Sequence, residues 1–124
     1  MSNGGGRLEL RDRHLIGIIG DKDTVTGMLL AGVGNIDGRQ KKNYYIVDGK
    51  TSREAIEEAF VDLTTRRDVA ILLISQHIAE MIRPLVDGYT EMLPALVEIP
   101  SKDHPYDPSL DSTMKQVNRL SATE

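Results

Sequence analysis

The chain has 124 residues, of which 40% are hydrophobic, and this fits one domain with a single core. Its net charge of −4, its single Phe and its lack of Trp argue against a nucleic-acid binder, which needs basic groups for phosphates and aromatic platforms for bases. Because Cys is absent, there is no disulfide, thiolate nucleophile or sulfur metal site, and no apolar run is long enough for membrane insertion.

The first 13 residues are predicted to be a flexible leader in front of a folded domain that covers residues 14–100. They contain three glycines and three arginines but no apolar stretch, which is not the pattern of a secretory signal. We therefore expect the leader to add nothing to the core.

An acidic turn follows the first predicted strand, at the position where nucleotide-binding folds place a phosphate loop. The strand covers residues 15–19, and Asp21 and Asp23 lie in the turn. Two carboxylates repel a phosphate, so they are interpreted as a helix cap and a partner of the helix dipole. A magnesium site of the receiver type is the alternative. The helix that follows is predicted to have one apolar face, formed by Val25, Met28, Leu29 and Gly32.

The rest of the folded domain alternates between strands and helices. Strands are predicted at residues 44–47, 69–74 and 95–99, and prolines on both sides of the last one favour an edge position. The helix after the second strand is predicted to begin with a capping box headed by Thr51. The helix after the third strand is predicted to be capped by Ser75 and interrupted near Pro84. The apolar stripes are Ile56, Ala59, Phe60 and Leu63 in the first of these helices, and Ile78, Met81, Ile82 and Leu85 in the second.

This alternation predicts a small doubly wound α/β fold of the flavodoxin or receiver type. Its sheet is expected to be parallel and four-stranded, with the strand order 2-1-3-4. Residues 101–108 contain two prolines and are predicted to be a linker, and residues 109–124 a C-terminal helical arm. The apolar stripe of the arm consists of Leu110, Met114, Val117 and Leu120.

The motifs of nucleotide-binding and catalytic sites are incomplete in this sequence. Gly49 and Lys50 resemble the end of a phosphate-binding loop, but Tyr44 stands where that loop needs its first glycine. His77 and Glu80 share a helix face and supply two metal ligands, where a site needs three or four. We therefore predict no catalytic residue, no cofactor and no metal.

Three segments resemble one known family. They are Ile18–Gly34, Ile74–Arg83 and Val97–Asp107, and they are similar to the F subunit of the eukaryotic vacuolar-type proton-pumping ATPase (V-ATPase). The resemblance extends from about Leu15 to Leu120 and leaves out only the leader.

The resemblance implies a non-catalytic protein of the central rotor stalk. Such a protein lies beside the coiled coil of the D subunit, below the ring of catalytic A and B subunits, and helps couple ATP hydrolysis to proton transport. It implies a cytoplasmic location, peripheral on the vacuolar or endomembrane surface. It also implies a parallel sheet with a mobile C-terminal arm.

The edge strand and the arm are the predicted surface for that partner. The hypothetical partner-binding residues are Glu98, Ser101, Lys102, Tyr106, Leu110, Met114, Val117 and Leu120. The alternative function is a degenerate receiver or nucleotide-sensing regulatory domain that uses Asp21 and Asp23.

Overall fold

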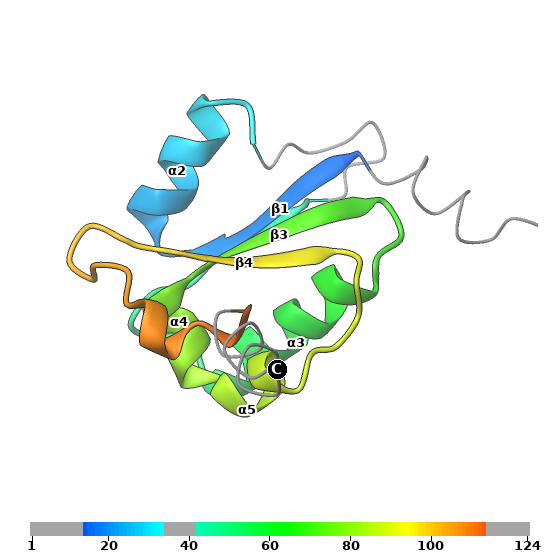
Figure 1. The fold of residues 1–124 in the computed structure, drawn as a ribbon. Coiled ribbons are helices and arrows are strands. Elements are labelled where there is room, and N and C mark those ends of the chain that lie inside the picture. Colours follow the sequence, from blue (N-terminus) through cyan, green and yellow to red (C-terminus); the bar gives the residue numbers. More distant parts are fainter. Residues whose placement is uncertain (1–13, 34–41, 114–124) are drawn as a thin grey trace, which may run out of the picture.

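A parallel sheet of four strands organises the computed structural model, which describes residues 14–33 and 42–113. The strands lie in the order β2-β1-β3-β4 (Figure 1), as predicted from the sequence. They are β1 (Leu15–Gly20), β2 (Tyr44–Ile46), β3 (Val69–Ser75) and β4 (Ala95–Ile99). The helices are α2 (Lys22–Leu30), α3 (Arg53–Thr65), α4 (Gln76–Met81), α5 (Arg83–Asp87) and the 3-10 helix η1 (Pro108–Leu110).

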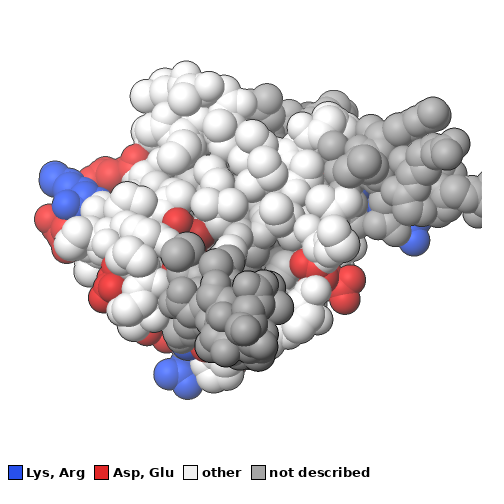
Figure 2. Space-filling model, in the orientation of Figure 1, with Lys and Arg blue, Asp and Glu red and all other residues white. Residues whose placement is uncertain are grey.

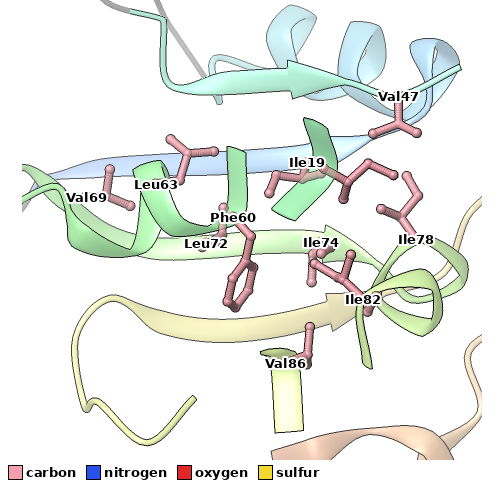
Figure 3. Packing of buried hydrophobic residues seen from close by; sticks show 12 residues of the cluster. Ile19, Val47, Phe60, Leu63, Val69, Leu72, Ile74, Ile78, Ile82 and Val86 are labelled. Atoms are coloured by element: carbon pink, nitrogen blue, oxygen red, sulfur yellow. The ribbon is translucent and has the colours of Figure 1, made fainter. Parts of the chain in front are cut away.

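The core lies between the sheet and the three helices α3, α4 and α5, which share one face of it (Figures 1 and 3). Strand residues that pair across a parallel sheet point to the same side, so Ile19 and Ile74 both enter this layer. The fully buried members include aliphatic side chains from strands β1 and β3 and from helices α3, α4 and α5. Phe60 packs edge-on against Tyr89 with ring centroids 6.0 Å apart. The cluster consists of Ile19, Val47, Ile56, Phe60, Leu63, Val69, Leu72, Ile74, Ile78, Ala79, Ile82 and Val86.

The second face of the sheet is only partly covered. Among the described helices, α2 alone lies on this side (Figure 1). Alternation along β3 and β4 sends five apolar side chains to this face, and they are half-buried or exposed. In Figure 2 most of the surface over the sheet and the upper part of α2 is uncharged, and charged atoms gather toward the left edge and the lower side. We call these five residues the open face: Ile71, Leu73, Ala95, Val97 and Ile99.

The start of α2 agrees with the sequence, but its end comes earlier than predicted. The Asp21 side chain accepts a hydrogen bond from the Thr24 amide at 2.9 Å, which confirms the predicted cap. The helix ends at Leu30, so Gly32 lies beyond it and contributes nothing to its apolar face. Gly32 adopts a φ of +93°, which a residue without a Cβ tolerates, and the chain turns there.

Two other predicted caps are wrong. Helix α3 is capped by Ser52, whose Oγ accepts from the Ala55 amide at 3.1 Å. The Thr51 hydroxyl is engaged with Asp48 instead, at 3.0 Å from both its backbone nitrogen and its Oδ1. Ser75 occupies the N-cap position of α4, but its side chain is fully buried and makes no capping hydrogen bond.

The predicted interruption near Pro84 is confirmed. Helix α4 ends at Met81, and α5 begins at Arg83 with Pro84 in its first turn, where a proline has no hydrogen bond to lose. Gly88 then ends α5. Met81 belongs to the apolar stripe predicted from the sequence, but 41% of it is exposed.

The predicted leader at residues 1–13 and the greater part of the predicted arm lie outside the described residues. Within the described part, residues 101–113 follow the end of β4. They include a turn closed by Ser101 and His104 and the short helix η1.

Candidate functional site

A buried carboxylate organises the edge of the sheet. Glu98 on β4 points to the same side as Ile74 and Leu96, and only 1% of its side chain is exposed. Arg83 donates to it through Nη1 at 2.7 Å and Nη2 at 3.2 Å. Gln76 Nε2 donates at 3.0 Å and the Ser112 amide at 3.2 Å. These hydrogen bonds offset the hydration that the buried carboxylate loses.

Arg83 holds three carboxylates around one guanidinium. Besides Glu98 it contacts Glu80 and Asp87, the latter at 3.6 Å. Partial burial opposes the charged form, but the hydrogen bonds with Glu98 and Glu80 outweigh it and raise the pKa of Arg83. The guanidinium therefore remains charged and ties α4, α5 and β4 together.

The segment after β4 is fixed to α4 by a reciprocal pair of hydrogen bonds. Gln76 Nε2 donates to the Asp107 carbonyl at 2.9 Å, and the Asp107 amide donates to Gln76 Oε1 at 2.6 Å. The Asp107 side chain then caps η1 by accepting from the Ser109 amide at 3.0 Å. The predicted linker is thus held against the domain at Asp107.

A second anchor lies just before the end of the described residues. The Tyr106 hydroxyl donates to Asp111 Oδ2 at 2.5 Å, and Asp111 Oδ1 accepts from the Thr113 amide at 2.9 Å. The hydrogen bond to Asp111 raises the pKa of Tyr106 to about 12. Asp111 and Ser112 are both buried, so the chain is anchored up to this point.

Replacing Asp111 by asparagine is expected to lower the pKa of Tyr106 from about 12 toward its ordinary value of 10.0, because the amide carries no charge to hold the hydroxyl proton. A pKa raised in the folded state stabilises the protein below pH 10.0, and this contribution is lost as the pH rises through about 12. Absorbance titration of tyrosinate measures the pKa, and subtracting the curve of Tyr106→Phe isolates this residue. If the pKa of Tyr106 stayed unchanged in Asp111→Asn, Asp111 would not be the cause of its shift.

The turn that follows β4 brings two histidines together. The backbones of Ser101 and His104 exchange hydrogen bonds at 3.0 and 3.1 Å. The ring of His104 then stacks on that of His77 from α4, with centroids 4.0 Å apart. His77 and Glu80, considered in the sequence analysis as possible metal ligands, supply only two of the three or four that a site needs. The described residues contain no group of three His, Cys, Asp or Glu that could hold a metal ion.

The acidic turn at the other predicted site serves the helix. Partial burial opposes ionisation of Asp21, but hydrogen bonding with Thr24 outweighs it and lowers the pKa of Asp21. Asp23 lies exposed in the first turn of α2, where its charge favours the helix dipole. The positions of Asp21 and Asp23 thus agree with their predicted roles as a helix cap and a partner of the helix dipole.

The predicted partner-binding residues occupy different environments. Lys102 is exposed, and Ser101, Tyr106 and Leu110 are half-buried, whereas Glu98 is buried. Met114, Val117 and Leu120 lie outside the described residues.

Sequence reasoning missed three residues of the Glu98 network. They are Gln76, Arg83 and Ser112, and their places along the chain give no local pattern. The available signal was weak: one glutamate in an otherwise apolar strand needs a cationic partner.

Comparison with known proteins gives the family. Residues 16–117 match the family described as ATP synthase (F/14-kDa) subunit. The chain belongs to this family.

None of the described helices has the length and apolar character that crossing a membrane requires.

Several family members are similar over nearly their full length. A protein from Arabidopsis thaliana, named as the F subunit of the V-type proton ATPase, is 55% identical over 114 residues, which cover 92% of this chain and 89% of that protein. The protein of the same name from Saccharomyces cerevisiae is 54% identical over 111 residues, covering 87% of this chain and 94% of that one. The crystal structure of the F subunit of the V-type ATP synthase from Archaeoglobus fulgidus matches with a TM-score of 0.52 and 26% identity, over 70% of this chain and 98% of that one.

Proposed function

We propose that this chain is a non-catalytic subunit of the central stalk of a vacuolar-type proton ATPase. There it turns with the rotor and helps couple ATP hydrolysis in the catalytic ring to proton transport. The observation that carries this proposal is the family match over residues 16–117, together with relatives at about half identity that are named as the F subunit of the V-type proton ATPase. The four-stranded fold, which the archaeal F subunit shares, supports it.

The proposed direct partner is the coiled-coil D subunit of the rotor, and the catalytic A and B subunits and the membrane sector are reached indirectly. The chain would then lie on the cytoplasmic side of the vacuole or another endomembrane, attached only through the complex. Neither a nucleic acid nor direct membrane insertion is part of this proposal.

The proposed contact surface consists of β4 and the segment that follows it. Ala95 and Val97 on β4 are exposed and belong to the open face, which is apolar and suits the apolar stripe of a helix. Lys102, Tyr106 and Leu110 belong to the segment after β4, which is held against α4 at Asp107. Glu98 contributes from inside, by holding the segment in place through the Ser112 amide.

The test is complex formation between the purified chain and the coiled-coil rotor protein. The unmodified chain is expected to form a one-to-one complex, and Val97→Asp to weaken it at least about tenfold, because a carboxylate in an apolar contact must lose its hydration. Light scattering after size exclusion gives the stoichiometry, and calorimetric titration gives the affinity.

Val61→Asp is the matched control. Val61 is 49% exposed on α3 and Val97 is 41% exposed on β4, so the two substitutions change similar side chains on opposite sides of the sheet. Thermal melts establish that both variants fold before binding is measured. Equal loss of affinity in the two variants would contradict the proposed surface, and failure of the unmodified chain to bind would contradict the stalk assignment.

A further inference from the structure

Two stacked imidazole rings join α4 to the turn that follows β4. His77 lies in the first turn of α4 and His104 closes the turn at residues 101–104. Their planes are inclined by only 10° and their centroids are 4.0 Å apart. The Ser101 hydroxyl lies 3.2 Å from Nδ1 of each ring. Neither the core nor the Glu98 network includes this pair.

The arrangement favours the neutral form of at least one ring. A serine hydroxyl has one hydrogen, so it donates to one Nδ1 and accepts from an N–H of the other ring. With both rings protonated, two positive charges would face each other at 4.0 Å, and the favourable stack becomes a repulsive one. Burial and then the nearby His104 lower the pKa of His77, while Asp21 opposes this shift.

The charged groups around the two rings do not cancel the repulsion between two protonated imidazoles. Asp21 at the start of α2 favours a first proton, but it is a single charge and cannot compensate two cations. Glu80, one turn further along α4, is already engaged with Arg83. Other charged side chains on the neighbouring elements are exposed to solvent, among them Lys22 and Asp23 on α2, and Lys102 and Asp103 in the turn.

We propose that His77 and His104 form a proton-sensitive latch that holds the turn at residues 101–104 against α4 near neutral pH and releases it when both rings are protonated. The turn leads directly from β4 into the segment anchored at Asp107, so its release loosens the start of that segment. Mild acidification of the surrounding solution would thereby change the surface that follows β4. This inference does not depend on the identity of the binding partner.

Nuclear magnetic resonance of the full chain tests the latch. Ring carbon shifts of the histidines are followed from about pH 8 to about pH 5, together with the exchange protection of the Ser101 and His104 amides. Protection of the two turn amides should fall by at least about fivefold once both rings are protonated, after correction for intrinsic exchange, with no loss at Ile74 in the sheet centre.

A variant that stacks without ionising provides the control. His104→Phe keeps an aromatic ring over His77 but carries no charge, so its turn should remain protected at about pH 5. Asp21→Asn should lower the pKa of His77 further, because the charge of Asp21 favours its protonated form. The latch would be disproved if the unmodified turn stayed protected with both rings protonated. Equal loss of protection in His104→Phe would disprove it too, since the charge of His104 would then have no role.

Discussion

Replacing Glu98 by alanine is expected to lower the free energy of unfolding by about 3 kcal/mol, the lower end of the range for removing one partner of a buried ion pair. Three groups lose a hydrogen bond at once: the Arg83 guanidinium, the Gln76 side-chain amide and the Ser112 backbone amide. The loss stays at the lower end because Arg83 keeps its contacts with Glu80 and Asp87. Urea unfolding followed by circular dichroism measures the change.

A second substitution at position 98 separates the effect of losing the charge from the effect of losing side-chain volume. Glu98→Gln keeps one acceptor oxygen and nearly the same volume, so it should cost about half as much as the alanine variant. Glu91→Ala, at an exposed position in the loop before β4, should change stability by less than about 0.5 kcal/mol. Combining Glu98→Ala with Arg83→Met should cost less than the sum of the two single changes, because the unpaired cation is removed. A Glu98→Ala variant as stable as the unmodified chain would show that the network does not hold the edge.

The sheet was predictable because its strands are marked in the sequence by more than one physical signal. The apolar run at residues 69–74 is too short for a helix, and prolines bracket residues 95–99 on both sides. Alternation with helices then allows few topologies, since parallel strands need right-handed crossovers. The observed order is one of these few.

The caps show where local patterns are insufficient. Thr51 and Ser52 are adjacent and both can accept a hydrogen bond from a helix amide. Asp48 engages the Thr51 hydroxyl, and this leaves Ser52 as the cap. Ser75 lies at the junction of strand and helix, but its buried side chain makes no capping hydrogen bond. The competing partner of Thr51 lies only three residues earlier in the chain, whereas the burial of Ser75 is a property of the assembled sheet.

The candidate site was less predictable, because its contacts join distant parts of the chain. The Glu98 and Asp107 contacts span 14 to 31 residues of sequence. A glutamate in an edge strand looks like a surface residue when the strand is considered alone. Alternation along the strand predicts the side of the sheet to which Glu98 points, but not what covers that side. Placing α4, α5 and residues 107–112 around that face is a property of the assembled fold.

The core should respond most strongly at its only phenylalanine. Phe60→Ala is expected to lower the free energy of unfolding by about 3–5 kcal/mol, because the ring is only 3% exposed and its removal leaves a cavity under the sheet. For a domain of this size that corresponds to a melting temperature lower by roughly 10–20 °C. A single-domain stability of about 5–15 kcal/mol makes this a large fraction of the total.

Two companion variants divide this loss into its parts. Phe60→Leu keeps much of the volume and should recover more than half of the stability lost in the alanine variant, since shape rather than burial is then the main change. Tyr89→Leu removes the edge-on ring contact, and its double-mutant cycle with Phe60→Leu should give a coupling of about 0.5–1.5 kcal/mol. Differential scanning calorimetry and urea unfolding give both quantities. A Phe60→Ala variant that melts within a few degrees of the unmodified chain would mean that α3 packs against the sheet through other side chains, and that the core described around Phe60 is not the one that holds the fold.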